Sequence, residues 1–190
     1  MDKGELRKRI LSIRNGLKPE EADHKSKIIM DKLISLDEYK NSKVVFVYMS
    51  FKNEVKTYDL IERMLSEHKR VVIPYTDTRN TEIIPSEIKS LKDDLVLNSF
   101  GYYEPVLEKV KQVNTEKLDL IIAPGVVFDE SLNRVGFGKG YYDRILSKKR
   151  KDAKAIAVAY EFQVVDEVPT EPHDIKMDMI ITEERTIVKR

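Results

Sequence analysis

The 190-residue sequence predicts an α/β fold in which helices flank a layered, mainly parallel sheet. Two observations support this fold class. Short apolar segments rich in β-branched residues, typical of strands covered on both faces, alternate along the chain with segments of helical periodicity. No internal repeat, low-complexity tract or flexible linker interrupts the alternation, so we expect a single domain over residues 1–190.

The first expected elements are two helices, a strand and a third helix. Residues 2–17 carry apolar side chains at helical spacing, and Pro19 is a favoured first-turn residue that opens a second helix. Residues 43–50 form a continuous β-branched and aromatic segment, which indicates a buried strand. Thr57 is a suitable N-cap for a helix over residues 58–68.

Most of the remaining expected elements are strands. In chain order they are strands over 70–75, 118–123, 155–160 and 177–182 and a helix over 140–149, with short strands near 81–84 and 95–97 in the less regular segment 77–117. Prolines punctuate two of these strands, because Pro74 is expected to close the first and Pro124 with Gly125 ends the second.

The composition excludes several classes of function. The chain has 34 Lys+Arg against 33 Asp+Glu, a net charge of +1, which argues against a dedicated nucleic-acid binder. The absence of cysteine excludes disulfides, thiolate metal sites and a cysteine nucleophile. No apolar segment reaches the roughly 18 residues of a membrane span, and the first residues lack a signal-peptide core. We therefore expect a soluble cytoplasmic protein with neither a nucleic-acid nor a membrane partner.

The most unusual segment is NRVGFGKGYYDR at 133–144, where three glycines surround Lys139 and follow Arg134. Glycines let backbone N–H groups approach phosphate oxygens closely, and the two cations would stabilise the charge on a transferring phosphoryl group. Asp143 would hold Mg²⁺ beside the same phosphates. The segment matches neither the Walker A pattern nor G-x-G-x-x-G, so a flexible loop between a strand and a helix is the alternative.

Charged residues elsewhere offer further candidates. On the first helix, Lys3, Arg7 and Arg14 form a basic stripe that borders the apolar side, although the stripe alone favours ordinary solvated surface charge. Glu54 lies in a loop after the strand at 43–50, at the sheet edge where ligands of α/β proteins bind, although a solvated loop residue is the alternative. Asp174 is a second candidate carboxylate for Mg²⁺, or simply a turn residue before a strand.

Two adjacent tyrosines open the helix that follows the glycine-rich segment. One member of the pair Tyr141 and Tyr142 is expected to stack on a planar ligand while the other enters the core.

Taken together, these segments resemble the 5-formyltetrahydrofolate cyclo-ligase family, also called 5,10-methenyltetrahydrofolate synthetases. The resemblance covers nearly the whole chain and rests on LRKRILSIRNGL followed by PEE, YMSFKNEVKT, IIAPGVVFD, NRVGFGKGYYDRIL and HDIKMDMIITE. One departure is Phe137-Gly138-Lys139, where many members carry Tyr-Gly-Gly. This change is expected to alter phosphate contacts without removing the function.

The resemblance implies a ligase that uses ATP and Mg²⁺ to close 5-formyltetrahydrofolate to 5,10-methenyltetrahydrofolate, with release of ADP and phosphate. It also implies an α/β fold of the kind found in sugar-phosphate isomerases and CoA transferases. Such a reaction needs no covalent nucleophile on the protein, because its requirements are the positioning of two substrates and the stabilisation of charge. We expect a cytoplasmic monomer whose partners are small-molecule substrates.

The resemblance also implies site residues. The ATP-binding residues are Lys3, Gly4, Glu5, Leu6, Arg7, Arg134, Val135, Gly136, Phe137, Gly138, Lys139, Gly140, Tyr141 and Tyr142. The folate-binding residues are Met49, Glu54 and the run Phe137, Gly138, Lys139, Gly140 and Tyr141. The metal ligands are Asp143 and Asp174, and Arg134 and Lys139 are the expected catalytic residues.

Two other classes of function remain as alternatives. A protein of the same fold could bind 5-formyltetrahydrofolate without turnover, or a sugar-phosphate or acyl-CoA enzyme could use Glu54 as its general base or nucleophile. ATP consumption distinguishes the ligase from both.

Overall fold

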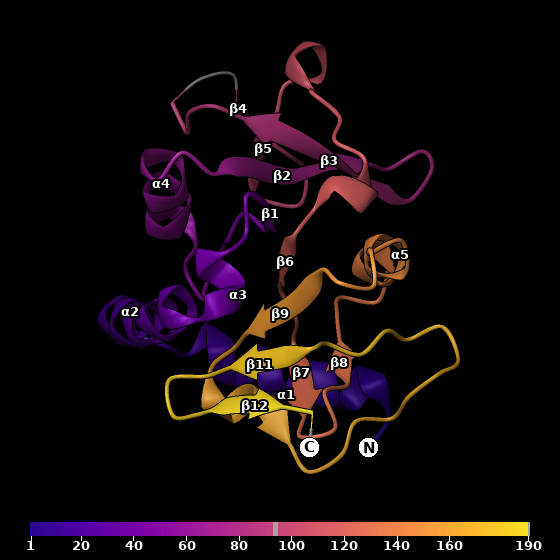
Figure 1. Cartoon of the computed structure of the whole chain (residues 1–190). Helices are drawn as coiled ribbons and strands as arrows, with labels where there is room; N and C mark the ends of the chain where they lie inside the picture. The colour runs from indigo at the N-terminus through magenta and orange to yellow at the C-terminus, as the bar shows by residue number, and fades with distance from the viewer. Residues whose placement is uncertain (93–94, 190) are drawn as a thin grey trace.

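A seven-stranded sheet forms the centre of the computed structural model, which describes residues 1–92 and 95–189. Its strands are β1 (Val44–Val47), β2 (Arg70–Asp77), β3 (Glu82–Ile88), β6 (Leu120–Ala123), β9 (Lys154–Val158), β11 (Met179–Ile181) and β12 (Thr186–Val188). They lie in the order β12-β11-β9-β6-β1-β2-β3 (Figure 1). The five inner strands are parallel and the two edge strands, β12 and β3, are antiparallel to their neighbours. The predicted α/β class with a mainly parallel sheet is thereby confirmed.

Helices and two small sheets surround the large one. The helices are α1 (Lys3–Asn15), α2 (Pro19–Ser35), α3 (Asp37–Lys40), α4 (Tyr58–Ser66) and α5 (Tyr141–Ser147), with 3₁₀ turns η1 (Leu107–Lys109), η2 (Thr115–Lys117) and η3 (Glu161–Gln163). One small sheet has the order β10 (Val164–Val165), β7 (Val127–Asp129), β8 (Arg134–Val135), and the other pairs β4 (Leu95–Leu97) with β5 (Tyr103–Pro105). The single domain predicted over 1–190 includes positions 93–94 and 190, which lie outside the described residues.

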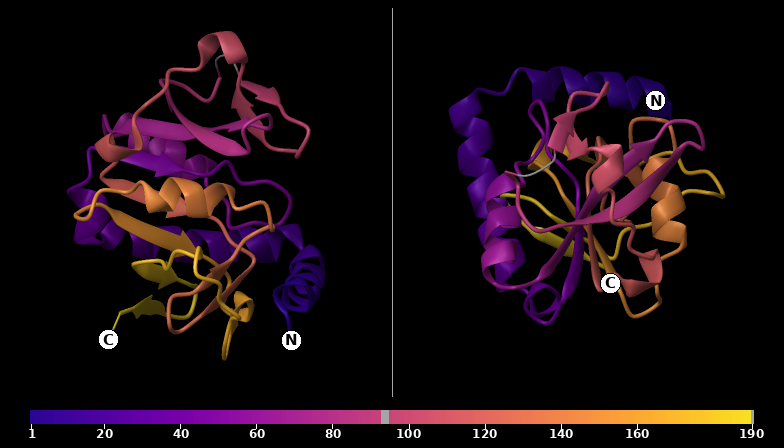
Figure 2. Two further views of the ribbon diagram at one scale, coloured as in Figure 1. Left: turned by 90° about the vertical axis from the view of Figure 1, so that its right-hand side faces the viewer. Right: turned by 90° about the horizontal axis from the view of Figure 1, so that it is seen from above.

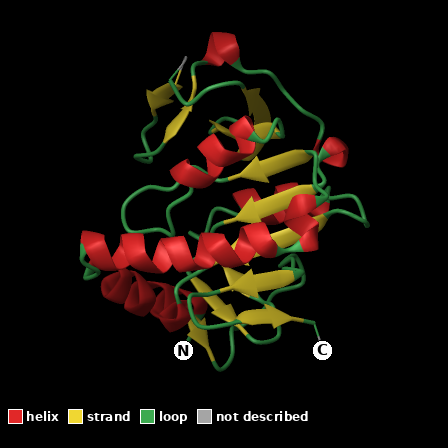
Figure 3. Ribbon diagram, turned by 60° about the vertical axis from the view of Figure 1, so that its left-hand side comes forward, coloured by secondary structure: helices red, strands yellow, loops and turns green. Residues whose placement is uncertain are grey.

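Successive side chains of a strand point to opposite faces of the sheet. Both faces of the large sheet are buried, each within its own hydrophobic cluster. In β1, Val45 and Val47 pack among residues of α2, α3 and α4, whereas Val44 and Phe46 pack with residues of α5. The right-hand view of Figure 2 places α2 and α5 on opposite sides of the sheet, and Figure 3 shows α2 lying across it. This arrangement explains why β1 and β6 are apolar along their whole length.

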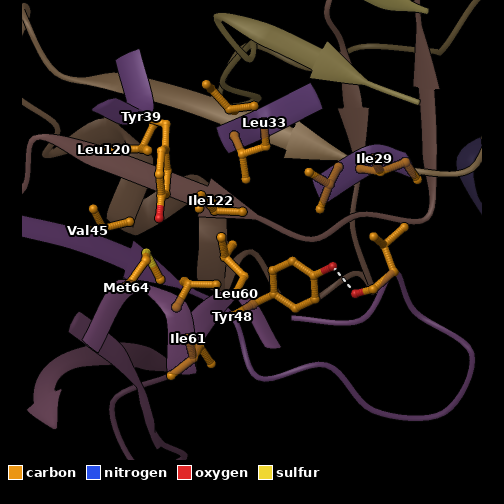
Figure 4. Close-up of a cluster of buried hydrophobic side chains, with 14 of the residues drawn as sticks. Ile29, Leu33, Tyr39, Val45, Tyr48, Leu60, Ile61, Met64, Leu120 and Ile122 are labelled. Atoms are coloured by element: carbon orange, nitrogen blue, oxygen red, sulfur yellow. Dashed lines mark hydrogen bonds between the residues drawn. The ribbon is translucent and has the colours of Figure 1, made fainter. Parts of the chain in front are cut away.

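The larger hydrophobic cluster extends to the end of β1, where the chain enters the loop that carries Glu54. Figure 4 shows Tyr48 at this end of the cluster, below side chains that include Leu33 and Ile122. The Tyr48 hydroxyl donates a hydrogen bond of 2.5 Å to the carbonyl oxygen of Val55. The loop is therefore closed on itself at the carboxyl edge of the sheet.

Helix α1 packs on the small three-stranded sheet. Asp2 and Glu5 form a capping box that starts the helix, because each side chain accepts a hydrogen bond from the other residue's backbone N–H. Leu6 and Ile10 then pack among apolar residues that include Val127. Since β8 leads into the glycine-rich segment, this packing brings the start of the chain beside that segment.

The C-terminal end of strand β2 differs from the prediction. The sequence predicted that Pro74 closes this strand, but β2 runs through it to Asp77. Pro74 lies opposite Pro85 of β3, so at this pair of residues neither strand has an N–H group to donate and the antiparallel register continues on either side.

Thr57 occupies the predicted N-cap position of α4 but does not cap it with its side chain. Its hydroxyl instead donates to the carbonyl oxygen of Tyr48 at 2.8 Å and accepts from the backbone N–H of Ser50 at 3.2 Å, which ties both ends of the Glu54 loop together. The helix after the glycine-rich segment is also shorter than the predicted 140–149. Within the described residues, no helix is long and apolar enough to cross a membrane.

Candidate active site

A cleft of about 450 Å³ opens at the carboxyl ends of β1 and β6. The chain continues from β1 to β2 on one side of the sheet and from β6 to β9 on the other, so these neighbouring strands mark the point where the strand order reverses. In open α/β sheets such a point leaves a crevice for ligands. Residues of the Glu54 loop, the glycine-rich segment, α1 and the β4–β5 hairpin line the cleft.

The glycine-rich segment forms one wall, and its glycines are required by its geometry. Gly138 and Gly140 have φ angles of +100° and +71°, a conformation that other residues rarely adopt. At Gly136, an added Cβ would lie 2.8 Å from Nη1 of Arg134. The segment therefore needs glycine to turn and to let the arginine side chain pass. Lys139 lies between these turns on the surface of the cleft.

Arg134 is the buried cation of this wall. Its side chain is only 3% exposed, and its guanidinium lies 3.3 Å from both the carbonyl oxygen of Pro124 and Oδ1 of Asp143. The guanidinium also lies over the ring of Tyr142, while its Nε has no partner among the described residues. A buried charge of this kind costs free energy unless it is paired, so Asp143 compensates it.

Helix α1 contributes two of the five residues predicted from its first turns. Nε of Arg7 donates a hydrogen bond of 2.7 Å to the carbonyl oxygen of Gly136, and Arg7 and Lys3 both line the cleft. Gly4, Glu5 and Leu6 do not line it. Glu5 belongs to the capping box and Leu6 is buried against the small sheet, so both side chains lie on other sides of the helix than the one that faces the cleft.

Lys3 is held by two acidic residues. Its Nζ lies 2.5 Å from Oδ2 of Asp174 and 2.8 Å from Oε2 of Glu171. Partial burial lowers the pKa of Lys3, but the hydrogen bonds to these carboxylates outweigh it and the pKa is raised. Partial burial raises the pKa of Asp174, but the hydrogen bonds from Lys3 and from the backbone of Glu171 lower it below its ordinary value.

The two predicted metal ligands lie near one another. Oδ1 of Asp143 accepts a hydrogen bond from the backbone N–H of Ile175, the residue that follows Asp174. Ligand atoms of Glu171, His173 and Asp174 lie within 4.8 Å of one another. Carboxylate oxygens are the donors that Mg²⁺ prefers in proteins, so this corner of the cleft fits such an ion chemically.

The Glu54 loop contributes a buried carboxylate to the cleft. The residue is 4% exposed, and Oε2 accepts a hydrogen bond of 3.1 Å from the backbone N–H of Phe51. Burial raises the pKa of Glu54 to about 7, although the positive charge of Arg14 opposes this effect. Met49, the other predicted folate residue outside the glycine-rich segment, is buried and also lines the cleft.

Several aromatic rings line the cleft. Phe51 lies 5.5 Å from Tyr102 and 6.2 Å from Phe137, measured between ring centroids, and Phe100 lies 6.3 Å from Tyr141. Tyr142 contacts the core residue Phe46, with 6.1 Å between ring centroids. Both tyrosines line the cleft and both pack against the core, so the expected division of the pair between ligand and core stays a prediction. Such a set of rings suits a planar ligand.

Sequence reasoning missed three kinds of residue at this site. Phe100 and Tyr102 come from the β4–β5 hairpin, inside a segment that showed no clear period. Glu171 and His173 join Asp174 although neither was predicted. Arg14, interpreted as surface charge, is 2% exposed. Its place on the border of an apolar stripe was the only available signal.

Comparisons with known proteins agree with the fold. A model of the 5-formyltetrahydrofolate cyclo-ligase family matches residues 1–183. A probable 5-formyltetrahydrofolate cyclo-ligase of Schizosaccharomyces pombe is 34% identical over 184 residues, which cover 87% of each chain. The NMR structure of Aquifex aeolicus 5,10-methenyltetrahydrofolate synthetase matches with a TM-score of 0.85 and 38% identity, covering 98% of this chain and 92% of that one. The structure of a 5,10-methenyltetrahydrofolate synthetase from Mycoplasma pneumoniae matches with a TM-score of 0.78 and 30% identity, covering 96% and 99%. The chain therefore belongs to the 5-formyltetrahydrofolate cyclo-ligase family and is a ligase.

Proposed function

We propose that this protein closes the ring of 5-formyltetrahydrofolate to give 5,10-methenyltetrahydrofolate, with ATP as the second substrate and Mg²⁺ as cofactor, and releases ADP and phosphate. One observation carries the proposal. The residues predicted separately for ATP, folate and Mg²⁺ come from distant parts of the sequence, and nearly all of them line one cleft. A reaction between two bound substrates needs such a shared cleft.

The two walls of the cleft suggest where each substrate lies. Lys3, Arg7 and the glycine-rich segment form the cationic side, which suits a triphosphate. Glu54 and Met49 line the same cleft together with the aromatic rings, of which Phe137 and Tyr141 belong to the glycine-rich segment. The buried carboxylate of Glu54 accepts hydrogen bonds, and the amino edge of a pterin donates them. We therefore place the pterin against Glu54 and the nucleotide against the glycine-rich segment.

The chemistry requires activation of the formyl oxygen, because expulsion of hydroxide at neutral pH is very unfavourable. The γ-phosphoryl group moves from ATP to this oxygen, so that a P–O bond to ADP breaks and a new P–O bond forms. N10 then attacks the formyl carbon, and the carbon–oxygen bond breaks with departure of phosphate. Loss of the N10 proton leaves the methenyl product, and no covalent bond to the protein is formed.

The protein stabilises charge during the first of these steps. Arg134 is fixed at the cleft wall by Pro124 and Asp143, and Lys139 is carried by the glycine turns, so both cations are available to the transferring phosphoryl group. Asp143 and Asp174 would hold Mg²⁺, which supplies positive charge to the phosphates when bound. Lys3 already pairs with Oδ2 of Asp174, so an ion bound to this carboxylate would compete with the lysine or use the other oxygen.

A single assay tests the proposal. The protein is incubated with 5-formyltetrahydrofolate, Mg²⁺ and ATP, while the absorbance of the methenyl product and the release of ADP are followed together. We expect one ADP for each methenyl product and no product without ATP. Folate binding without ADP release would favour a non-catalytic binder, and turnover of a sugar phosphate or acyl-CoA without ATP would favour the other alternative.

We also propose that the protein acts as a cytoplasmic monomer on these small molecules. The support is that one copy of the chain supplies both walls of the cleft. Light scattering during size-exclusion chromatography tests the monomer directly.

A further inference from the structure

Arg14 is a buried cation that the proposed mechanism does not use. It lies in the last turn of α1 and is 2% exposed. Among the described residues it is the largest of the fully buried side chains. Its Nη1 makes a long hydrogen bond of 3.5 Å to the carbonyl oxygen of Gly125, and its Nε has no partner among the described residues. Within that part of the chain, no carboxylate oxygen lies within 4 Å of the guanidinium. A buried charge so weakly compensated is costly and requires an explanation.

The surroundings of Arg14 connect it with both walls of the cleft. Its guanidinium carbon lies 5.7 Å from the ring centroid of Phe137, in the glycine-rich segment. On the other side, Nδ2 of Asn53 donates to the carbonyl oxygens of Arg14 at 2.8 Å and Leu17 at 3.2 Å, so the loop of Glu54 is fastened to the end of α1. Arg14 therefore lies behind the cleft surface, next to the loop that presents Glu54.

We propose that Arg14 is a positioning residue for folate recognition, whose buried positive charge behind the loop of Glu54 stabilises the negative charge of that carboxylate where it lines the cleft. Arg14 is not among the residues that line the cleft, so its proposed action on the substrate is through Glu54. The inference rests on the proposed function, because it assigns Arg14 to the folate contact that Glu54 makes.

The other groups that face Glu54 cannot take over this task. Lys52, on the same loop, is exposed to solvent, which screens its charge. Three tyrosines also interact with Glu54 from elements packed against the loop. Burial raises the pKa of Tyr48 and Tyr142 well above the ordinary value and that of Tyr160 to about 12, so all three remain neutral near pH 7. Arg14 is the buried cation among these neighbours.

The experiment replaces Arg14 by methionine, which removes the charge while keeping a long side chain, and by lysine, which keeps the charge. Arg9→Met is the matched control, because Arg9 is exposed on the same helix and its loss changes the net charge equally. The titration of the Glu54 carboxyl group is followed by ¹³C NMR in the full-length, substrate-free protein, with Glu54→Gln used to assign the signal.

We expect the wild-type midpoint near pH 7, an increase of about one pH unit in Arg14→Met, and little change in Arg9→Met and Arg14→Lys. An unchanged midpoint in Arg14→Met would overturn the inference. Should Arg14→Met fail to fold, Arg14→Lys decides, because an increase of about one unit despite the retained charge would also overturn it.

Substrate binding gives a second readout. An increase of one unit lowers the ionised fraction of Glu54 at pH 7 from about one half to about one eleventh, so the Kd of 5-formyltetrahydrofolate should rise about fivefold. The loss should largely disappear near pH 9, with kcat little changed and KM for folate raised at pH 7. A loss of affinity independent of pH would assign Arg14 a packing role and refute the inference. Failure of the wild-type protein to bind folate would instead refute the proposed function, while the NMR titration still tests Arg14.

Discussion

Replacing Glu54 by glutamine should stabilise the substrate-free protein at neutral and alkaline pH. The residue is 4% exposed, and burial raises the pKa of its carboxyl group from 4.5 to about 7. Ionisation of this group is therefore more costly in the native state than in the unfolded chain. Glutamine keeps the shape and an oxygen that can accept the hydrogen bond from the backbone of Phe51, but it cannot ionise.

The direction and size of the effect follow from proton linkage. Because the native state binds this proton more tightly, the stabilisation by the neutral group is complete below about pH 4.5 and is lost as the pH rises through about 7. A difference of about 2.5 units in pKa corresponds to about 3 kcal/mol of the free energy of unfolding. The glutamine variant does not lose this contribution.

Urea unfolding of both proteins at several pH values from about 4 to about 9 measures the effect. The advantage of Glu54→Gln over the wild type should grow by about 3 kcal/mol across this range. Glu62→Gln, an exposed position on α4, serves as the control and should show no such growth. An advantage of Glu54→Gln that does not vary with pH would refute the reasoning from burial.

The same variant should bind folate more weakly, because the amide presents a donor to the donors of the pterin, a mismatch that costs roughly 1–3 kcal/mol. ATP binding, measured by calorimetry, should be nearly unchanged. Equal damage to both would remove Glu54 from the folate wall.

Two further predictions concern the rest of the cleft and one concerns Gly125 behind it. Lys139→Ala should lower kcat on the order of 10²-fold with little effect on folate affinity, because the lysine stabilises charge that grows during phosphoryl transfer. Steady-state kinetics measure this effect, and unchanged turnover would show that Lys139 is only an exposed residue of the loop. Asp143→Asn should raise the Mg²⁺ concentration needed for activity, and a magnesium titration that overlays the wild-type curve would remove Asp143 from the metal site. Gly125→Ala should lower the melting temperature strongly, because the added Cβ would lie 2.3 Å from the ring of Phe128, and an unchanged melting temperature would show that the ring moves aside freely.

Local sequence patterns predicted the elements whose side chains repeat with a clear period. Helices α1 and α2 each bury one stripe of apolar side chains, which gives their sequences a helical period. Strands β1 and β6 are buried on both faces, so their sequences are continuously apolar. Strands β8 and β10 have two residues each and cannot show a period. They form because partners distant in the sequence hold them, and a sequence pattern contains no such information.

The candidate site divides in the same way. The glycine-rich segment was recognisable because its turns need glycine, and Glu54 because it follows a strong strand. The burial of Arg14 depends on which elements pack over the border of a helix, and those are the loop of Asn53 and the segment of Phe137. The roles of the individual cleft residues remain predictions for the experiments above.

The pairing of opposite charges in the cleft has a consequence for the form in which the nucleotide enters. Lys3 with Asp174 and Arg134 with Asp143 each join a cation proposed to bind phosphate to a carboxylate proposed to bind Mg²⁺. Nucleotide arriving alone would leave the carboxylates without their cations, and the ion arriving alone would leave the cations without their carboxylates. The magnesium–nucleotide complex offers new partners to both members of each pair at once. On the proposed roles, the empty cleft therefore admits the complex more readily than either component.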